Sequence, residues 1–272
     1  SRALAVKHPL RLEQAGWRGR RAAGAALALG AVVALALTLG SAGLWAVGHE
    51  DSLPEKFRRA PHSLMSLSVG YPNAGWQLRP VALEKRRYLS IKKGSEDDVW
   101  GHPALVKMLY RTARDLSKVA SGTKMLVGDL SSKTGGPLAG HASHQSGRDA
   151  DVGFFAKDAK GKRVILDRFV AFGGDGKALD GSGLVFDDWR NWLLVQSWIR
   201  DYRAHISHIF VSQPLRGRLL AYASGNKRRS KYLEQATVLL GEPSDSSPHD
   251  DHFHVRIACP KKQQEICHDE PR

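Results

Sequence analysis

The apolar positions of residues 102–258 recur at two spacings, one typical of helices and the other of strands. Apolar residues three and four positions apart mark one face of a helix, whereas strict alternation marks a half-buried strand. We therefore predict helices over residues 102–120, 187–202, 214–224 and 229–240. We predict strands over residues 123–130, 149–155, 206–212 and 252–258. Because strands and helices do not alternate regularly, the fold class is expected to be α+β, with a mostly antiparallel sheet and flanking helices in a single domain.

Residues 49–80 show neither spacing. They are rich in Pro, Gly and Ser, which predicts a linker over residues 49–62 and then an irregular segment. We place the folded domain at residues 63–267 and a short polar tail at residues 268–272.

Two of the predicted strands carry imidazole and carboxylate side chains on one face, because residues two apart in a strand point the same way. In the last strand the polar face carries His252, His254 and Arg256, and the apolar face carries Phe253, Val255 and Ile257. In the strand over 149–155 the polar face carries Asp149 and Asp151, and the apolar face carries Ala150, Val152 and Phe154. Each strand thus presents a rigid pair of polar side chains to a cleft.

The N-terminal part has a different pattern. Residues 22–48 carry no formal charge and follow a basic flank over residues 1–21. A helix of that length would span roughly 40 Å, enough for a hydrocarbon core of about 30 Å. The segment is predicted to be a transmembrane anchor, or a signal segment if it is cleaved, and the basic flank predicts export of everything after it.

Charge and cysteine content narrow the function. Residues 1–48 hold six Lys or Arg and one Glu, a net of +5, which leaves +9 of the total +14 for residues 49–272. This excess favours an anionic partner, and export favours a wall polymer over nucleic acid. Two cysteines exclude a disulfide-dense scaffold and a four-cysteine zinc module. In an oxidising compartment Cys259 and Cys267 are candidates for a disulfide, with two free thiols as the alternative.

Five of the 12 histidines fall into two short windows. The first window holds His141 and His144 just before the Asp149–Asp151 pair, and the second holds His249, His252 and His254. Three nitrogen or oxygen ligands and a water make the usual open catalytic zinc site. A loop that folds back at Gly147 would bring His144 over the strand that carries Asp151. Together the two windows predict a zinc site.

The same windows resemble a known family. GHASHQSGRDAD (140–151) and HDDHFHVRI (249–257) are similar to the two signatures of the penicillin-insensitive murein endopeptidases. These are zinc peptidases related to D-Ala-D-Ala carboxypeptidases and to the hedgehog fold. The resemblance continues in RRYLSIKKG (86–94), WGHPALV (100–106) and VGDLSS (127–132), and it covers roughly residues 63–267.

The resemblance implies zinc bound by His144, Asp151 and His254. It implies His252 as the catalytic base, His249 as an auxiliary group that orients or stabilises the transition state, and His141 as a neighbour of the metal or an extra ligand. The family's further Asp-x-x-His pattern meets only Asp188 and Asn191 here, so the resemblance does not extend to a second metal site and leaves that question open. The implied substrate is the D-alanyl–meso-diaminopimelyl cross-link of peptidoglycan, hydrolysed in the periplasm.

Other interpretations remain open from the sequence. Two alternatives are enzymes of the same zinc group, a D-Ala-D-Ala carboxypeptidase and an L,D-type endopeptidase. A third alternative is a catalytically inactive, zinc-containing wall-binding module. A basic metal-dependent nuclease conflicts with export. Asp149 is expected to cap a turn, and Arg148 and Arg256 either bind substrate carboxylates or lie on a solvated strand face. The sequence predicts no oligomeric state.

Overall fold

A computed structural model describes residues 49–243 and 247–271, and the chain separates into two units. Of the first unit, residues 1–58, the described part contains the short helix α2 (Glu55–Arg58). The predicted basic flank (1–21) and apolar segment (22–48) lie outside the described residues. Across the described parts of the chain, no helix combines the length and the apolar character needed to cross a membrane.

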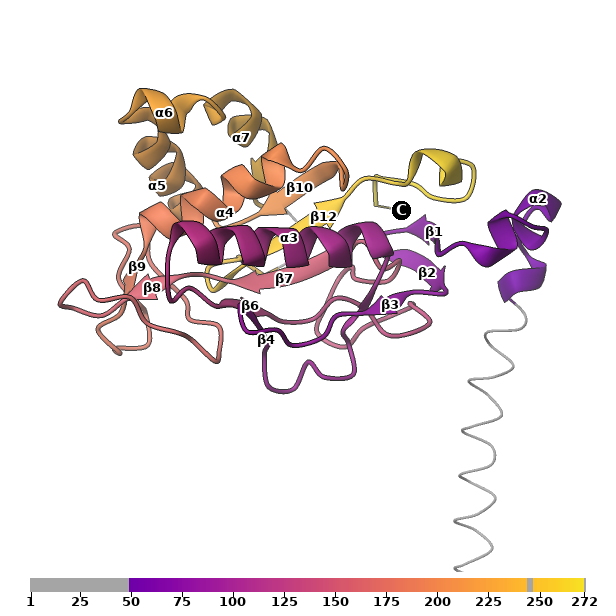
Figure 1. Ribbon diagram of the computed structural model, residues 1–272, viewed down its shortest axis with the longest axis horizontal. Coiled ribbons are helices and arrows are strands. Elements are labelled where there is room, and N and C mark those ends of the chain that lie inside the picture. The colour runs from indigo at the N-terminus through magenta and orange to yellow at the C-terminus, as the bar shows by residue number, and fades with distance from the viewer. Residues whose placement is uncertain (1–48, 244–246, 272) are drawn as a thin grey trace, which may run out of the picture. The chain divides into compact units, whose positions relative to one another are not determined.

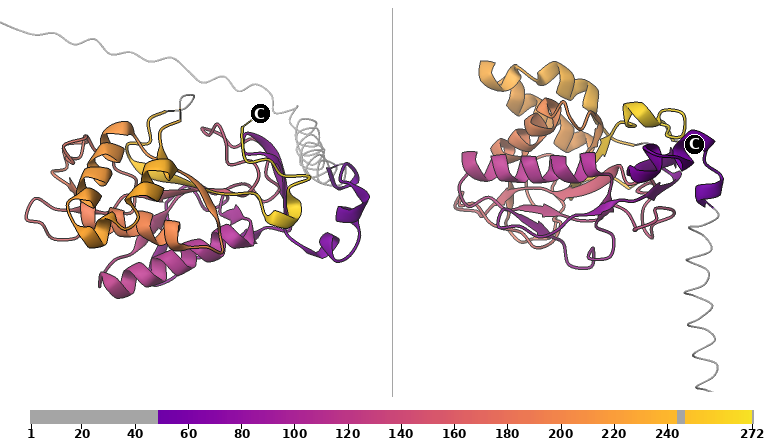
Figure 2. Two further views of the ribbon diagram at one scale, coloured as in Figure 1. Left: turned by 90° about the horizontal axis from the view of Figure 1, so that it is seen from above. Right: turned by 45° about the vertical axis from the view of Figure 1, so that its right-hand side comes forward.

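The second unit, residues 59–272, is built around a six-stranded sheet (Figures 1 and 2). Its strands, in spatial order, are β11 (Leu240–Gly241), β10 (Ile206–Phe210), β12 (His252–Ile257), β7 (Asp149–Gly153), β6 (Met125–Val127) and β4 (Leu89–Ile91). The pairs β10–β12, β12–β7 and β7–β6 are antiparallel, but β10–β11 and β4–β6 are parallel. The sheet is therefore mixed, and the prediction of a mostly antiparallel sheet is wrong.

The connections explain the parallel pairs. Parallel neighbours need a long crossover, which is usually helical. The crossover from β4 to β6 contains α3 (Pro103–Val119), and that from β10 to β11 contains α5 (Gln213–Ser224), α6 (Lys227–Ser230) and α7 (Leu233–Leu239). Hydrophobic spacing located β6, β10 and the crossover helices, but it did not locate β4 or β11, the partners that make the parallel pairs.

The predicted helices form close to their expected ends, except that the fourth is split into α6 and α7. The helix over 187–202 is α4 (Asp188–Arg200), and it packs beside α3 on one face of the sheet (Figure 1). Each of these two helices has a side-chain cap at its start. His102 accepts a hydrogen bond from Ala104 N–H, and Asp187 accepts one from Arg190 N–H. Such caps satisfy donors that the first turn leaves unpaired.

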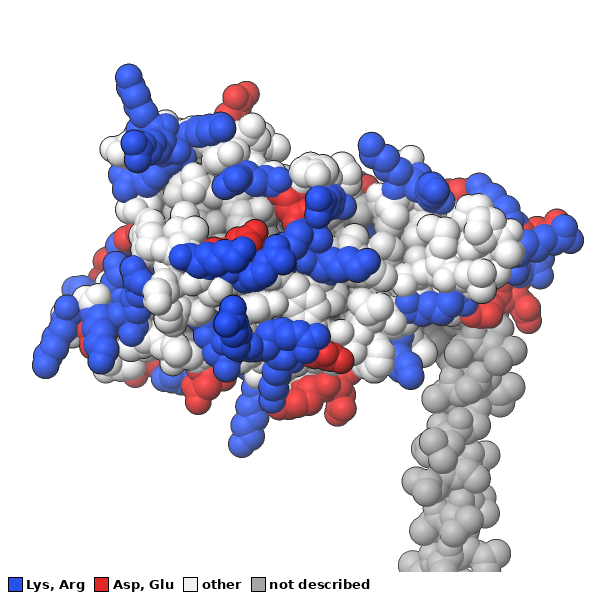
Figure 3. Space-filling view, viewed as in Figure 1, with Lys and Arg blue, Asp and Glu red and all other residues white. Residues whose placement is uncertain are grey.

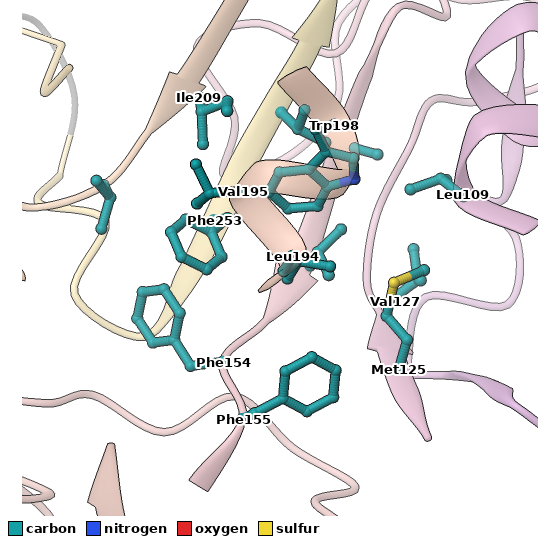
Figure 4. Packing of buried hydrophobic residues seen from close by; sticks show 14 of the residues in the cluster. Leu109, Met125, Val127, Phe154, Phe155, Leu194, Val195, Trp198, Ile209 and Phe253 are labelled. Carbon is teal, nitrogen blue, oxygen red and sulfur yellow. The ribbon is translucent and has the colours of Figure 1, made fainter. Parts of the chain in front are cut away.

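The hydrophobic core lies between these helices and the sheet, as Figure 4 shows for residues of α3, α4, β6 and β12. Trp198 of α4 meets the ring of Phe253 at 5.6 Å. Phe253, Val255 and Ile257 are all buried, which confirms the predicted apolar face of the last strand. Burying each such side chain is worth about 1.5–3 kcal/mol, so this face anchors the strand. The opposite face of the sheet is left for the polar side chains.

The segment after residue 63 is ordered, contrary to the prediction of an irregular stretch. β1 (Leu67–Tyr71) and β2 (Ala74–Leu78) form an antiparallel hairpin. Smaller pairs join β3 (Val81–Ala82) to β5 (Trp100–Gly101) and β8 (Ala156–Lys157) to β9 (Val185–Phe186). The 3-10 turns η1 (His62–Leu64) and η2 (Lys261–Gln263) complete the secondary structure of the described residues. The hairpin was missed because Gly70, Gly75 and Pro72 interrupt its pattern.

The C-terminal residues are fastened to this hairpin. Cys259 and Cys267 form a disulfide, as predicted. On either side of Cys267, Gly70 N–H donates to Ile266 O, and His268 N–H donates to Gly70 O. The tail predicted to start at residue 268 thus begins with residues that pack on the domain.

Many basic side chains lie on the helical side of this unit. Figure 3 shows Lys and Arg over and below α3, and Lys107, Arg114 and Lys118 of that helix are exposed. Because α3 covers the apolar face of the sheet, this basic surface is on the other side of the sheet from the histidines of β12.

Candidate metal centre

Two rows of register partners, polar except for Phe210, cross the sheet on the face away from α3 and α4. In the first row Phe210 of β10, His254 of β12 and Asp151 of β7 are register partners. In the second row the partners are His208, Arg256 and Asp149. The sequence predicted the two strand faces, and the pairing of β12 with β7 makes them one surface.

His144 reaches this surface from the loop before β7. Its backbone φ is +67°, a left-handed conformation that is uncommon for a residue with a side chain, and Gly147 follows at φ +72°. The His144 Nδ1–H donates to Leu130 O at 2.6 Å. Its Nε2 therefore carries a lone pair, and it lies 3.3 Å from Asp151 Oδ1. As expected, the loop folds back at Gly147 and brings His144 to Asp151.

His254 and His141 also use one ring nitrogen for a hydrogen bond, in their case to a carboxylate, and keep a lone pair on the other nitrogen. His254 Nε2–H donates to Asp149 Oδ1 at 2.9 Å, which leaves the lone pair on Nδ1, 3.7 Å from Asp151 Oδ1. His141 Nε2–H donates to Asp129 Oδ2 at 3.0 Å, which leaves its Nδ1 3.7 Å from Asp151 Oδ2. A histidine fixed by a carboxylate on one nitrogen, with the other free, is the usual arrangement of a metal ligand.

Two buried atoms at the centre are unsatisfied. His144 Nε2 and Asp151 Oδ1 have no hydrogen-bond partner among the described residues. Buried polar atoms without a partner are costly unless something else binds them. The ligand atoms of His141, His144 and Asp151 all lie within 4.8 Å of one another, so these three residues could hold a metal ion. A set of nitrogen and oxygen donors fits zinc and similar transition metals.

The electrostatics act on each member of this donor set. Burial lowers the pKa of His144, but Asp151 outweighs it and raises that pKa, so a cation at Asp151 would compete with the His144 proton. Burial raises the pKa of Asp151, but His144 and His252 outweigh it and hold that pKa well below its usual range. Burial and the adjacent His144 lower the pKa of His254 to about 4. His254 is therefore neutral at neutral pH and keeps the lone pair on Nδ1.

His252 and His249 lie beside this donor set. His252 Nδ1–H donates to Asp251 Oδ1 at 2.5 Å, and its Nε2 is 3.4 Å from Asp151 Oδ1. Burial lowers the pKa of His252, but Asp151 and then Asp251 raise it to about 10. A cation at Asp151 would compete with that proton and lower this pKa. His249 has its ring 5.1 Å from His252, and burial followed by the nearby His254 lowers its pKa to about 3.

One contact to His252 could not be found from the sequence. The ring of Phe169, from the long loop between β8 and β9, stacks on His252 with 4.9 Å between ring centres. Phe169 stands in a segment with no motif and no regular spacing, so no local signal marks it.

All five clustered histidines border a cavity of about 400 Å³. Its other walls include Pro72 and Asn73 of the β1–β2 turn, Phe210 and Pro271. The structure thus brings together every residue that the sequence singled out as a ligand or catalytic group.

The remaining candidates are distributed differently. Arg148 is fully buried, does not line the cavity, and donates to the backbone of Ile257 and His268 and to Asp269. Both alternatives predicted for it, a substrate-binding group and a solvated residue, are therefore wrong. Asp149 accepts a hydrogen bond from His144 N–H, as a turn-capping acid does, but it also accepts from His254 and Arg256.

Asp188 and Asn191, the weak match to a second metal motif, have other partners. Both Asp188 oxygens accept from Arg218, at 2.6 and 2.7 Å. The Asn191 amide forms two hydrogen bonds with the backbone of Phe155.

Comparison with known proteins gives one consistent result. The profile of the family described as penicillin-insensitive murein endopeptidase matches residues 74–272. A protein of that name from Escherichia coli O157:H7 (strain EC4115 / EHEC) is 26% identical over 185 residues, which cover 68% of this chain and 62% of the relative. Another of that name, from Escherichia coli O6:K15:H31 (strain 536 / UPEC), is 26% identical over 242 residues, covering 89% of this chain and 81% of the relative. The chain thus spans less than two thirds of the first relative and about four fifths of the second.

Proposed function

The chain belongs to the penicillin-insensitive murein endopeptidase family, and we propose that it is a zinc-dependent endopeptidase that hydrolyses D-alanyl–meso-diaminopimelyl cross-links in peptidoglycan. The observation that carries this proposal is the convergence of lone pairs on Asp151, where buried nitrogen and oxygen atoms have no partner among the described residues. Such a site suits a divalent cation held beside a cleft.

The ligands in this proposal are His144 through Nε2, Asp151 through Oδ1 and His254 through Nδ1. His141 is an additional ligand or a neighbour, because its Nδ1 faces the other oxygen of Asp151. Three protein ligands leave room for a water and for the substrate carbonyl. When bound, Zn²⁺ polarises a carbonyl group and makes a coordinated water more acidic.

His252 moves the proton. Its Nδ1–H is held by Asp251, so the ring is oriented with Nε2 toward Asp151 and the cleft. That nitrogen accepts a proton from the attacking water and returns it to the leaving amine, a step typically worth about 10²–10⁴-fold. His249, 5.1 Å from His252 and 5.4 Å from His254 between ring centres, is positioned to orient the substrate or stabilise charge on its carbonyl oxygen.

We also place this reaction in the periplasm, with the chain either anchored through residues 22–48 or released after cleavage of that segment. The apolar character of the segment and the basic flank before it support this location. Retention of the protein in washed inner membranes, against release into the soluble periplasmic fraction, distinguishes the two forms.

The test is digestion of a purified cross-linked muropeptide dimer by the zinc-loaded protein, with and without a chelator. We expect conversion of the dimer into two monomers without free D-Ala, and loss of that activity on chelation. Release of free D-Ala would instead indicate a D-Ala-D-Ala carboxypeptidase. Cleavage at an L,D bond would indicate an L,D-type endopeptidase. Zinc bound at about one ion per chain, with neither product, would indicate a wall-binding module.

A further inference from the structure

Arg256 is an unusual residue for the floor of a cleft. It is only 4% exposed, and among the described residues that line the 400 Å³ cavity it is the only Lys or Arg. A buried guanidinium is costly unless its charge and its donors are satisfied. The hydrogen-bond partners of Arg256 therefore show which of its donors are left to bind a ligand.

The charge of Arg256 is balanced, but its hydrogen-bonding capacity is only partly used. Its Nε–H donates to Asp149 Oδ1 at 2.5 Å, and its guanidinium carbon lies 5.4 Å from the centre of the Phe210 ring. Among the described residues, its two terminal nitrogens donate to nothing. Four N–H groups at the end of a fixed, planar side chain thus remain available.

Arg148, the residue before Asp149, shows what a structural arginine looks like in this fold. All three of its nitrogens donate: Nε to Ser146 Oγ, Nη1 to Ile257 O and Asp269 Oδ1, and Nη2 to His268 O. It does not line the cavity. Arg148 precedes Asp149 in the sequence, and Arg256 is the register partner of Asp149 on β12. Both arginines are buried, but only Arg256 lines the cavity and keeps free donors.

Asp149 fixes Arg256 next to the metal ligands. The same oxygen, Oδ1, accepts from Arg256 Nε and from His254 Nε2, at 2.5 and 2.9 Å. The guanidinium is therefore the immediate neighbour of His254, and Arg256 lines the cavity that the clustered histidines border. A paired set of terminal N–H donors matches the two oxygens of a carboxylate.

We propose that Arg256 binds the free carboxylate on the diaminopimelate side of the cross-link and so selects cross-links in which that carboxylate is unmodified. This inference rests on the proposed function. In diaminopimelate each amino group shares its carbon with a carboxyl group, so the carbon bonded to the scissile nitrogen carries a carboxylate. That carboxylate lies next to the bond that is cut, as Arg256 lies next to His254.

The experiment compares two muropeptide dimers that differ only at that position, one with a free carboxylate and one with a carboxamide. Their kcat/KM values are measured for the wild type, Arg256→Gln, Arg256→Lys and, as a matched control, Arg148→Gln. Zinc content and the circular dichroism spectrum are recorded for each protein. Binding of both dimers to His252→Ala, which should not cleave them, is measured by calorimetry.

We expect the wild type to prefer the carboxylate dimer by about 10- to 100-fold, the range for a charge-assisted hydrogen-bonded pair. Arg256→Gln should lower kcat/KM for that dimer to the value for the carboxamide dimer, mainly through KM. Arg256→Lys should keep part of the preference, and Arg148→Gln should keep all of it even where it lowers stability.

Equal rates of the wild type on both dimers, or equal loss on both in Arg256→Gln, would overturn the inference and leave the proposed function intact. Cleavage of neither dimer by the zinc-loaded wild type would instead contradict the proposed function. In that case calorimetry still tests Arg256: equal binding of the two dimers to His252→Ala refutes its role, and a preference for the carboxylate dimer supports it only if that preference is lost in the double variant His252→Ala/Arg256→Gln.

Discussion

Replacement of Asp149 by Asn tests how the sheet holds the metal centre. Asp149 is completely buried, and its carboxylate accepts hydrogen bonds from Arg256, His254 and the His144 backbone. Burial raises the pKa of Asp149, but Arg256 and then His254 outweigh it and hold that pKa far below its usual range. The group is therefore a charged carboxylate at any pH at which the protein is used. Asn keeps the shape and removes the charge.

The expected loss of stability comes from Arg256, which remains buried and charged after its partner is neutralised. Arg256 stays buried at 4% exposure with no opposite charge on its Nε–H. Removing one member of a buried ion pair typically costs about 3–5 kcal/mol, because the other charge is left uncompensated. We expect Asp149→Asn to lower the free energy of unfolding by that amount in a denaturant titration of the metal-free protein.

Metal affinity should fall as well. The His254 ring is oriented by its hydrogen bond to Asp149, and that bond places the lone pair on Nδ1. Loss of such a carboxylate partner of a metal-binding histidine commonly costs 10- to 100-fold in affinity. Competition against a chromophoric chelator measures the zinc dissociation constant of the folded variant.

Asp187→Asn is the matched control. Asp187 is equally buried and paired with Arg190 at 2.7 Å, but it caps α4 and does not line the cavity. It should lose a similar amount of stability with unchanged zinc affinity. If Asp149→Asn costs less than about 1 kcal/mol, or if both variants bind zinc like the wild type, the reasoning is refuted.

Three further predictions concern other parts of the domain. His252→Ala should bind zinc normally and cleave cross-links about 10²–10⁴-fold more slowly; cleavage at the wild-type rate would assign the base elsewhere. Burial lowers the pKa of His102 to about 4 from an unfolded value near 6.5, so the unfolded chain binds more protons between these values. The helix cap in which His102 accepts from Ala104 N–H is thus fully effective above about pH 6.5 and is lost as pH falls toward 4, at a cost of roughly 2–4 kcal/mol. His102→Asn, which can still cap, should reduce this fall between pH 7 and 4.5 in urea titrations, whereas an equal fall in both proteins would exclude His102 as its source. Reduction of Cys259–Cys267, which closes a loop with a sequence separation of 8, should cost about 2–3 kcal/mol in the same titrations, and an unchanged midpoint would contradict this.

The sequence predicted which polar side chains lie together better than it predicted the order and direction of the strands. The site depends on short-range alternation: His252 and His254 share a face whatever the strand pairs with, and so do Asp149 and Asp151. Their meeting needs only that β7 and β12 be neighbours, and both strands have one buried face to cover. These features are local, so a single sequence contains them.

The direction and order of the strands depend on long-range packing. β4 and β11 have three and two residues, too few to show a pattern, and both make the parallel pairs that the prediction lacked. The contact of Phe169 with His252 likewise depends on the path of a long loop. The different roles of Arg148 and Arg256 follow from the fold of the C-terminal tail, which covers the first and leaves the second open to the cleft.

Anomalous diffraction from crystals of the zinc-loaded full chain, recorded on both sides of the zinc absorption edge, tests the metal centre most directly. We predict one strong peak within bonding distance of His144 Nε2, Asp151 Oδ1 and His254 Nδ1, at the point where these lone pairs converge. A peak that His254 does not touch, for example one held by His141 and Asp129, would contradict the assignment, as would a zinc-loaded crystal with no peak in this cleft.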